Sequence, residues 1–403
     1  MSKIDELIIE LCPDGVGYKT LGEIATDIYR GSGIKRDQVT EIGTPCVRYG
    51  EIYTTYNIWF DYCKSHTDVK TITGKKYFGQ GDILFAITGE RVDEIAKSCV
   101  YIGGDKCLAG GDVVVMKHNE NPKYLSYALS TTAAQKQKSK GKVKSKVVHS
   151  SVPALKAIKL PIPPLPVQQE IVRILDKFTT LEAELEAELE ARKKQYGYYK
   201  DRLLLFGENR GRAKYLSLND IGKVSMCKRI FKEQTQSDGD IPFYKIGTFG
   251  KKPDAFISQT VFDEYKEKYS YPKKGDVLLS AAGTIGRAVI FDGIPSYFQD
   301  SNIVWIENDE KIVSNKYLYY FYTVAKWAVS EGGTIARLYN DNIHKTIIPV
   351  PPLTEQERIV AILDRFDALV NDITQGLPAE IEARRKQYEY YRDNLLTFKE
   401  KVL

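Results

Sequence analysis

The stretch Leu160–Phe178 reads LPIPPLPVQQEIVRILDKF, and a close copy, IPVPPLTEQERIVAILDRF, stands at Ile348–Phe366. The two copies share 11 of 19 residues at a register shift of 188 (348 − 160). A second pair, Ala191–Phe206 and Ala383–Phe398, shares 11 of 16 residues at a shift of 192 (383 − 191). The segments that precede the copies differ from each other. The chain therefore has a duplicated frame that carries two different preceding domains.

Each copy of the repeat predicts one long helix. A Pro-Pro pair, Pro163-Pro164 or Pro351-Pro352, ends an extended segment and sets the start of the helix. Apolar residues then recur every three or four positions, which indicates a narrow coiled-coil seam. Because a whole domain connects the two helices, we expect them to pair antiparallel and cover each other's seams. The alternative is that each helix packs only on its own domain. The residues expected at the helix–helix or subunit interface are Leu175, Phe178, Leu181, Leu185, Leu189, Tyr196, Tyr199, Leu363, Phe366, Ile381, Tyr388 and Tyr391.

The two predicted helices differ in the middle. The first, from Gln168 to Phe206, would be about 58 Å long and contains the tandem LEAELEAELEAR at Leu181–Arg192. The second holds Gln375-Gly376-Leu377-Pro378, which predicts a kink or break with Pro378 in the first turn of a new helix. Four residues lengthen a helix by about 6 Å, so we interpret the tandem as an adjustable spacer. A simple low-complexity helix is the alternative.

The preceding domains match each other only in short turns. Tyr18–Ile24 is similar to Tyr215–Ile221, and Gly81–Leu84 is similar to Gly275–Leu278. Both domains show short β-branched and aromatic runs broken by Gly, Asn and Asp. The predicted fold class is α/β, with two mixed α/β domains of one fold, separated by a pair of long antiparallel coiled-coil helices in a pseudo-twofold internal repeat. The expected boundaries are 1–166 and 207–352 for the domains, and 167–206 and 353–403 for the helices.

Composition excludes several classes of protein. No apolar run approaches the roughly 18 residues that span a bilayer, and the N-terminus lacks the pattern of a signal peptide. The six cysteines contain no CxxC pair, which favours free thiols in a reducing cytoplasm. The four histidines do not stand at metal-ligand spacing. We therefore expect a cytoplasmic protein without a membrane partner or a metal.

Positive charge is concentrated in the first domain. Residues 1–166 hold 23 Lys and Arg against 18 Asp and Glu. Within them, Gln135–Lys146 (QKQKSKGKVKSK) has a lysine at every second position. If this segment is extended, its ammonium groups project from one face and could follow a phosphate backbone. A solvated loop is the alternative. The lysines concerned are Lys136, Lys138, Lys140, Lys142, Lys144 and Lys146.

Basic and aromatic residues are interleaved in both domains. Arg and Lys pair with guanine edges in the major groove or neutralise phosphates, and the sequence leaves both roles open, as well as plain solvated surface. The DNA-binding candidates of the first domain are Arg30, Lys35, Arg36, Arg48 and Tyr49. Those of the second are Lys228, Arg229, Lys245, Lys251, Lys252, Arg287 and Arg337.

The repeated motifs resemble those of a known family. The helix start PPLxxQxxIVxILD, the helix end KQYxYYxDxLLxF, and their duplication around two divergent domains are similar to the specificity subunit of type I restriction–modification systems. The resemblance covers the whole chain in order. The domains match only in sparse turns such as Gly81-Asp82 and Gly283-Thr284-Ile285-Gly286, as target-recognition domains would.

The resemblance implies a non-catalytic DNA-recognition subunit. Each domain would read one half of a bipartite, asymmetric site in double-stranded DNA, with the helices fixing the unread gap. The helices would bind two adenine methyltransferase subunits, and restriction subunits carrying nuclease and translocase would join them. S-adenosylmethionine, ATP and Mg²⁺ would bind to those partners and none of them to this chain.

Four other interpretations start from weaker patterns. Pro253-Asp254 followed by Glu264-Tyr265-Lys266 fits a loose metal-nuclease pattern without a counterpart in the first domain. Asn121-Pro122-Lys123-Tyr124 is the nearest match to a methyltransferase NPPY motif, with Lys in place of the second Pro. A coiled-coil scaffold without a DNA role is the third, and a specificity chain of another methylation-based defence system is the fourth.

Overall fold

The computed structural model describes residues 2–142, 146–205, 213–329 and 337–401. It forms two compact units, Met1–Leu185 with Ile381–Leu403, and Glu186–Glu380. We call the part of each unit that precedes its Pro-Pro pair the first head (residues 12–162) and the second head (residues 213–350). Within the described residues, no helix is long and apolar enough to cross a membrane.

The first head is built from two small mixed sheets. One sheet has the order β2-β12-β8-β10-β5 and the other β3-β6-β4-β11-β7. Their strands are β2 Ala25–Arg30, β12 Val113–His118, β8 Ile83–Ala86, β10 Ser98–Tyr101, β5 Trp59–Phe60, β3 Val39–Thr40, β6 Ser65–Thr67, β4 Thr44–Val47, β11 Cys107–Ala109 and β7 Tyr77–Phe78. Two short pairs add β1 Tyr18–Thr20 with β14 Lys159–Pro161, and β9 Thr88–Gly89 with β13 Val148–His149. The helices of this unit's head are α2 Leu21–Ile24, α3 Tyr49–Thr54, α4 Pro122–Ser130, α5 Thr132–Ser139 and α6 Val152–Lys156, preceded by α1 Lys3–Leu11.

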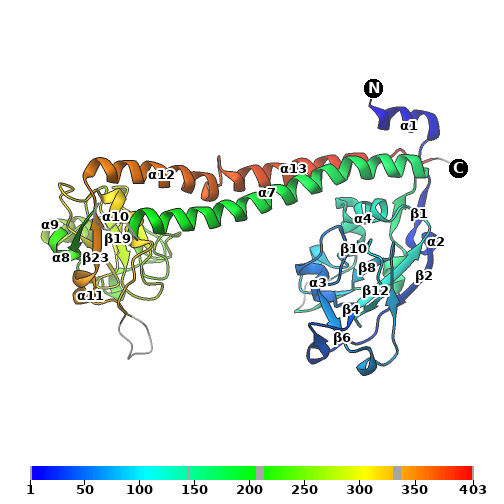
Figure 1. The fold of residues 1–403 in the computed structure, drawn as a ribbon, viewed down its shortest axis with the longest axis horizontal. Coiled ribbons are helices and arrows are strands. Elements are labelled where there is room, and N and C mark those ends of the chain that lie inside the picture. The colour runs from blue at the N-terminus through cyan, green and yellow to red at the C-terminus, as the bar shows by residue number, and fades with distance from the viewer. Residues whose placement is uncertain (1, 143–145, 206–212, 330–336, 402–403) are drawn as a thin grey trace. The chain divides into compact units, whose positions relative to one another are not determined.

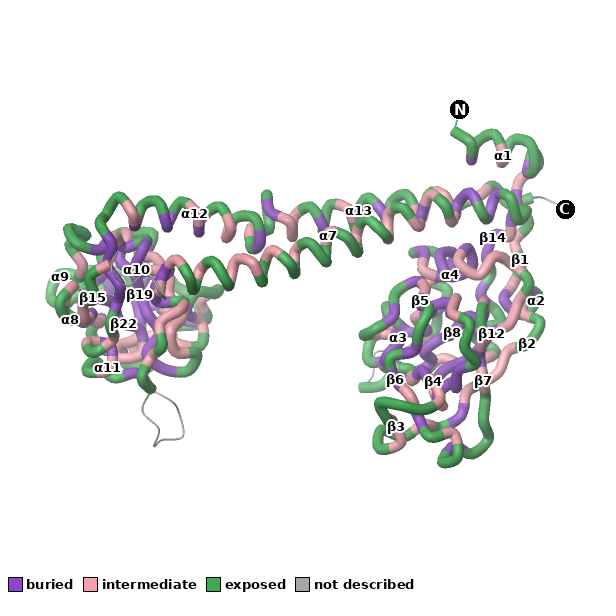
Figure 2. Tube along the Cα trace, in the orientation of Figure 1, coloured by how far each residue is buried: buried purple, intermediate pink, exposed green. Residues whose placement is uncertain are grey.

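The second head repeats this plan with fewer strands. Its sheets have the orders β16-β22-β19-β20 and β18-β17-β21, and β15 pairs with β23. The strands are β15 Lys214–Ser217, β16 Val224–Ser225, β17 Ile241–Tyr244, β18 Phe256–Ile257, β19 Val277–Ser280, β20 Ala288–Ile290, β21 Tyr297–Phe298, β22 Ile303–Ile306 and β23 Ile347–Val350. The helices are α8 Leu218–Ile221, α9 Gln259–Lys268, α10 Asn315–Tyr322 and α11 Asn340–Lys345. Figure 2 shows that many buried residues of each head lie on its strands and on the helix beside them, α4 or α10.

The frame consists of α7 Leu165–Leu205, α12 Leu353–Asn371 and α13 Leu377–Leu395 (Figure 1). The beginning of α7 packs on the first head, where Ile171 and Leu175 are fully buried in the core with Leu125 of α4. The beginning of α12 packs in the same way on the second head, through Ile359 and Leu363. Full burial of each such side chain contributes about 1.5–3 kcal/mol, so each head holds the start of its own helix.

In each unit, the helix start of one repeat lies against the helix end of the other. In the first unit, the Phe178 ring stacks on Tyr391 at 5.4 Å, and Arg385 pairs with Glu182 at 2.6 Å, so α13 runs antiparallel to the start of α7. In the second unit, Phe366 of α12 stacks on Tyr196 and Tyr199 of α7 at 6.1 and 5.8 Å. The predicted antiparallel coiled-coil pairing is confirmed, and the seam uses matched aromatic residues of the two repeats.

A buried glutamine ties each head to its helix. The Gln168 side chain is completely buried; its Nε2 donates to Pro163 O at 2.8 Å, and its Oε1 accepts from Asn121 N at 3.0 Å. Gln356 repeats both bonds, to Pro351 O at 2.9 Å and from Ser314 N at 2.9 Å. One amide thus satisfies the Pro-rich turn and the first turn of α4 or α10 at once.

A carboxylate about two turns further along each helix forms a second joint with the head. Asp176 accepts from Lys123 Nζ at 2.7 Å and from the Tyr127 hydroxyl at 2.7 Å. Asp364 accepts from Lys316 at 2.7 Å and from Tyr320 at 2.6 Å in the second unit. Both joints lie within the repeated sequence, so the same head-to-helix attachment is built twice.

The predicted break in the second helix is confirmed. α12 ends at Asn371 and α13 begins at Leu377, with Pro378 in its first turn. Gly376 is buried, and a Cβ at this position would come within 2.4 Å of Ala368 O. The Asp372 carboxylate accepts from Thr374 N at 2.7 Å and stabilises the turn. The four residues that the second copy has in excess are thus accommodated in a non-helical turn.

The two ends of the chain meet in the first unit (Figure 1). Val16 N donates to Lys399 O at 2.9 Å, and Lys401 N donates to Val16 O at 3.0 Å. Ile4 of α1 and Leu396 belong to the same hydrophobic core. The helix end of the second repeat is therefore fastened to the beginning of the chain.

We expect Gln168→Ala and Gln356→Ala each to lower the free energy of unfolding by about 1–3 kcal/mol, because each strands a buried backbone N–H and carbonyl. Denaturant unfolding would measure the loss. The control is Gln169→Ala, whose side chain is exposed in the next position of α7. Equal stability of the Gln168→Ala and Gln169→Ala variants would contradict the role of the buried amide.

Candidate nucleic-acid interface

The two heads place a basic residue at the end of the same strand. β4 pairs parallel with β11 in the first head, and β17 pairs parallel with β21 in the second. The residue that follows β4 is Arg48, and the residue that follows β17 is Lys245. Arg48 is half-buried and lies 3.6 Å from the carboxylate of Glu51. Lys245 pairs with Asp254 at 2.8 Å.

Hydrogen bonds fix which loop of one head corresponds to which loop of the other. In the first head, Ile87 N donates to Asp112 O at 3.0 Å and Ser150 N donates to Ile87 O at 2.8 Å. In the second, Ala281 N donates to Asn302 O at 2.7 Å and Leu338 N donates to Ala281 O at 2.8 Å. Asp112 therefore corresponds to Asn302.

The same register relates the predicted residue Arg337 to His149 of the first head. His149 lies opposite Thr88 on β13 and β9, and Arg337 lies opposite Ala282 in an isolated bridge. His149 thus corresponds to Arg337. Thr88 Oγ1 and His149 Nδ1 are 3.1 Å apart, whereas Arg337 Nη2 donates to Asn302 Oδ1 at 2.8 Å. At this corresponding backbone position, the first head has an imidazole and the second head has a guanidinium.

In the first head, Arg30 and Arg48 lie on either side of Gly110-Gly111. Arg30 Nε donates to Gly111 O, and its Nη2 pairs with Asp112. A Cβ on Gly110 would come within 3.2 Å of Arg48 Cα. Tyr49 follows Arg48 and is 39% exposed. These three predicted residues form what we call the first basic cluster.

In the second head, Lys245, Arg287 and Arg337 surround the loop that follows β19. Arg287 Nη1 donates to Phe249 O at 2.8 Å, four residues after Lys245. Arg337 Nη2 also reaches Ser301 Oγ at 3.3 Å. We call these residues the second basic cluster.

The remaining candidates of the heads lie outside the two clusters or at their margins. Lys35 and Arg36 are exposed at a 3₁₀ turn shortly after Arg30, and Lys251 and Lys252 are exposed beyond β17. Arg229 is exposed, and Lys228 lies over the Tyr269 ring at 5.1 Å.

The prediction of an extended lysine segment is wrong for its first half. Thr132–Ser139 is the helix α5, capped by the Thr131 side chain, which accepts from Ala134 N at 3.2 Å. Residues two apart on a helix point in different directions, so Lys136 is exposed and Lys138 is buried. Lys140 and Lys146 are exposed and Lys142 is half-buried, while Lys144 lies outside the described residues.

Lys138 is therefore not available to a phosphate. It is 4% exposed, and its Nζ hydrogen-bonds to Ser98 Oγ at 3.3 Å. Burial lowers the pKa of Lys138 to about 7.

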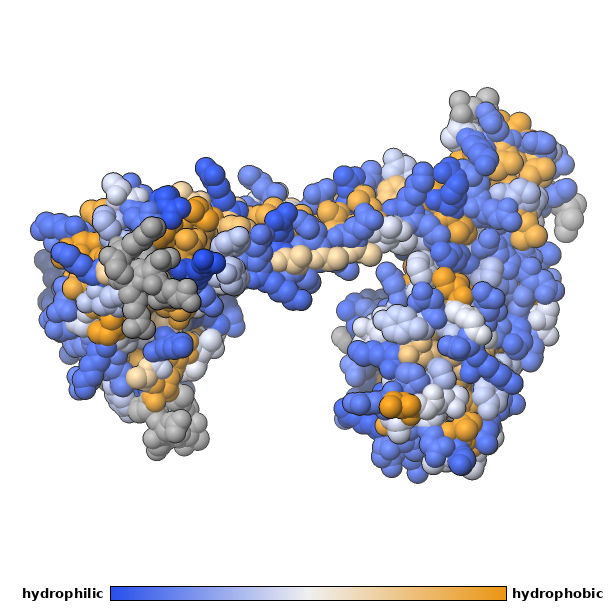
Figure 3. Space-filling view, viewed as in Figure 1, coloured by the Kyte–Doolittle hydropathy of each residue, from blue (hydrophilic) through white to orange (hydrophobic). Residues whose placement is uncertain are grey.

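The residues expected at the helix interface differ in burial. Leu175, Leu363, Ile381 and Tyr388 are buried, and Phe178, Phe366 and Tyr196 are half-buried in the aromatic contacts. Leu185 and Leu189 are half-buried, whereas Leu181 and Tyr199 are 37% and 39% exposed, and Tyr391 is 41% exposed. Hydrophobic side chains are interspersed among hydrophilic ones along α12 and α13 (Figure 3).

The residues of the two loose enzyme patterns make other contacts in the part of the chain that the structure describes. They contain no group of three or more His, Cys, Asp or Glu side chains that could hold a metal. Asp254 pairs with Lys245, and Glu264 pairs with Lys268 on α9 at 3.0 Å, so the loose nuclease pattern does not converge. Asn121 caps α4, and Tyr124 is fully buried with its hydroxyl on Pro161 O.

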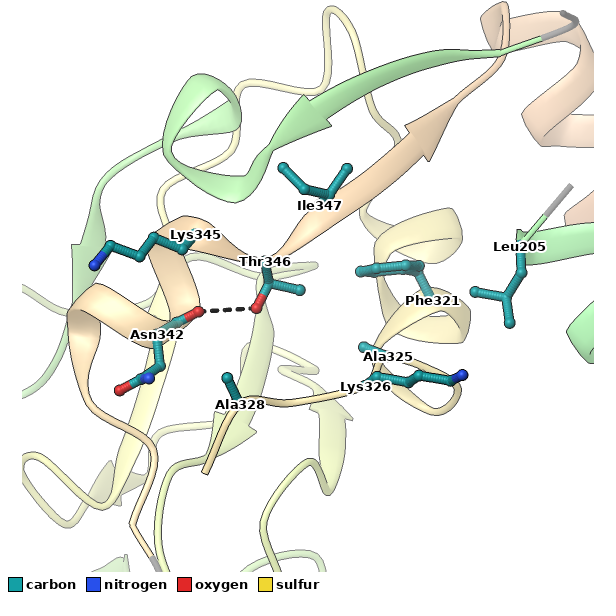
Figure 4. A pocket seen from close by; sticks show the side chains of 9 residues that line it. All are labelled: Leu205, Phe321, Ala325, Lys326, Ala328, Asn342, Lys345, Thr346 and Ile347. Atoms are coloured by element: carbon teal, nitrogen blue, oxygen red, sulfur yellow. Dashed lines mark hydrogen bonds between the residues drawn. The ribbon is translucent and has the colours of Figure 1, made fainter. Parts of the chain in front are cut away.

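A pocket of about 340 Å³ lies in the second unit between Phe321 and Ile347 (Figure 4). The Thr346 hydroxyl donates to Asn342 O at 2.9 Å on one wall. Among the described residues, the lining includes no carboxylate, cysteine or histidine. The ionisable side chains of the described lining are those of Lys326 and Lys345.

Comparison with known proteins identifies the family. The family model for the type I restriction modification DNA specificity domain matches residues 13–191 and matches again over residues 213–383. The chain belongs to this family. Each match contains one head and the helix that follows it, as the sequence repeat predicts.

Relatives of this specificity-domain protein carry corresponding names. A Haemophilus influenzae protein named as a type I restriction enzyme specificity subunit is 60% identical over 266 residues, which are 64% of this chain and 68% of that protein. The Escherichia coli specificity subunit of the enzymes EcoR124I and EcoR124II is 39% identical over 60% of this chain and 63% of its own length.

Solved structures of specificity subunits share the fold. A structure titled for complex assembly and conformational transition of the type I R-M system matches with a TM-score of 0.63 and 16% identity, over 95% of this chain and 97% of that one. The S subunit from M. genitalium matches with a TM-score of 0.53 and 14% identity, over 95% and 96%. The predicted fold class is confirmed.

Several residues that build this specificity-domain protein escaped the sequence reasoning. Gln168 and Gln356 recur at the shift of 188, and that recurrence was the available signal for a buried joint. Asp112, Asn302 and His149 carry no such signal, because only the hydrogen-bond register of the folded heads brings them into corresponding places.

We expect Lys138→Met to stabilise the protein at pH 6 by a few kcal/mol, about 5 at most, because the buried ammonium carries a desolvation penalty. The folded pKa lies below the ordinary value, so the penalty is fully present below pH 7 and disappears as pH rises toward 10.5. Denaturant unfolding at pH 6 and pH 9.5 would show the difference shrinking. Lys136→Met, exposed on the same helix, is the control, and an equal effect of both variants would contradict burial of the charge.

Proposed function

We propose that this chain is the sequence-specific DNA-recognition subunit of a type I restriction–modification complex. Each head reads one half of a bipartite site in double-stranded DNA, and the helices carry the partner subunits. The subunit performs no chemistry itself. S-adenosylmethionine, ATP and Mg²⁺ bind to the methyltransferase and restriction subunits.

The observation that carries this proposal is the correspondence of the two basic clusters. Arg48 of the first cluster and Lys245 of the second both follow a strand of a parallel pair. Arg337 of the second cluster corresponds to His149, which lies outside the first cluster, so the side chains at corresponding positions differ. Identical heads in a twofold arrangement would read a palindrome. Different side chains on the same frame support an asymmetric pair of half-sites.

Exposed residues at the two helix ends support the binding of one partner copy to each repeat. Tyr198 and Tyr390 occupy equivalent positions of the repeat and are 57% and 66% exposed. Each is followed by a tyrosine that packs on the facing helix, Tyr199 or Tyr391. Exposed aromatic residues are typical of protein–protein interfaces. Equal surfaces on both repeats fit two copies of one methyltransferase subunit, and restriction subunits complete the assembly.

Mapping of methylated adenines in the source cell tests the proposal. We expect one split, asymmetric motif to lose methylation when this chain is deleted and to regain it on complementation. A chain without the second head's Lys245 and Arg337 charges, replaced together by Ala, should fail to restore it. An unchanged methylation map in cells that express the methyltransferase subunit would contradict the proposal and favour a DNA-independent scaffold.

Insertion of one further LEAE unit after Glu188 tests the spacer. Four helical residues add about 6 Å, so we expect both half-sites to stay the same and the unread gap to widen by about one or two base pairs. A length-preserving control replaces Glu184 and Glu188 by Ala, which should leave the gap unchanged. The same single-molecule methylation map reads both results, and an unaltered gap after the insertion would contradict the spacer role.

A further inference from the structure

We propose that Arg30 is a base-reading residue of the first head and takes the edge of a guanine in its half-site. This inference rests on the proposed function. It goes further because it distinguishes one basic residue that reads a base from basic neighbours that contact phosphates.

Two hydrogen bonds hold the guanidinium in a fixed orientation. Arg30 Nε donates to Gly111 O, and Nη2 donates to Asp112 Oδ1. These bonds occupy one edge of the guanidinium. The other edge, formed by Nη1 and the second Nη2 proton, keeps two parallel donors. That is the geometry which binds guanine O6 and N7 together in the major groove.

The Arg30–Asp112 pair is a poor source of stability. The side chains are 60% and 33% exposed, and exposed ion pairs contribute about 0–1 kcal/mol. What the pair does supply is a restricted rotamer for a long side chain. A recognition group needs such support, because an unfixed side chain loses entropy when it binds.

Glycines beside Arg30 allow two backbone segments of the first head to pack closely. A Cβ on Gly31 would come within 2.2 Å of Gly110 O, and a Cβ on Gly111 would come within 3.1 Å of Gly33 Cα. The two backbone segments therefore lie directly against each other, which glycine permits because it has no Cβ. This contact holds the Gly110-Gly111 segment, whose carbonyl anchors Arg30, beside the end of β2.

The flanking charges fit a phosphate role. Lys35 and Arg36 are exposed at the 3₁₀ turn after Arg30. For these two residues the structure gives no anchoring bond from the guanidinium or ammonium group to the protein within the described residues. Mobile cations neutralise phosphates without reading sequence, whereas an anchored guanidinium can discriminate between bases.

The second head places an arginine on the corresponding loop from a different point of the chain. Arg30 ends β2, whereas Arg337 precedes α11 and corresponds by register to His149. Arg337 nevertheless contacts Asn302, the counterpart of Asp112. An arginine thus occurs at this place in both heads although the shared backbone does not require one.

The test uses the full chain co-expressed with the methyltransferase subunit of its system. The methylation motif of the wild-type complex is first mapped, and binding is then measured to duplexes with each base pair substituted. We expect Arg30→Ala to lose discrimination at one G·C pair of one half-site by about 5-fold to 150-fold, with the other half-site unchanged. Arg30→Lys should lose it too, because a point charge cannot form the bidentate pair.

Two further variants separate reading from charge and from folding. Asp112→Asn keeps Arg30 and weakens its anchor, so part of the discrimination should be lost. Lys35→Ala should weaken binding to all duplexes by a similar factor and reduce the salt dependence of binding. Unfolding curves show whether each variant is folded.

Folded Arg30→Ala and Arg30→Lys complexes with the wild-type pattern of discrimination would overturn the inference, as would a uniform loss over all sequences. A wild-type complex that methylates no bipartite motif would refute the proposed function instead.

Discussion

The structure depends on a buried amide that is used twice. Gln168 and Gln356 each join a Pro-rich turn to the first turn of a head helix, with both ends of the amide hydrogen-bonded in a fully buried place. A buried amide that loses one hydrogen-bond partner costs more free energy than the bond contributes to stability. Both hydrogen bonds are therefore needed together. Each head is thereby held to the beginning of its helix in one orientation. A recognition domain at the end of a long helix requires this, because any slack at the joint would be passed on to the DNA contacts.

The second constraint is the exchange of helix ends between the repeats. Phe178 of the first repeat stacks on Tyr391 of the second, and Phe366 of the second stacks on Tyr199 of the first. Each unit therefore contains parts of both repeats, and neither repeat is complete alone. The contacts between the N-terminal segment and Lys399–Lys401 fasten the last helix in the first unit, where no peptide bond connects it to the head. The non-helical turn around Gly376 accommodates the extra length of the second copy without disturbing either aromatic contact.

The heads show why a binding residue is harder to predict than a scaffold residue. Residue type alone selected Arg30, Arg48, Lys245 and Arg337, and the folded heads bring them to corresponding loops. The anchors of Arg30 and Arg337, which are Gly111, Asp112 and Asn302, were not predicted, since they are distant in sequence from the residues they hold. The alternating lysines were interpreted as an extended face, but the Thr131 cap and the helix-forming residues after it produce α5, and the helical period buries Lys138. Alternation by itself does not distinguish the two structures when the hydrophobic residues are few.

The sequence by itself determined the duplicated frame, the two long helices, the break at Gly376-Leu377-Pro378 and the family, because these follow from local backbone chemistry and from a repeat that is visible in the residue order. Only the tertiary structure decided which helix segments pair, which lysine is buried, and which arginine is held by a distant loop. The reason is that such contacts join residues far apart in the chain, such as Tyr18 and Phe398 at a separation of 380 positions, and no local preference encodes them. Packing selects among the faces that the sequence offers, and in this protein that selection separates a fixed guanidinium from a merely solvated charge.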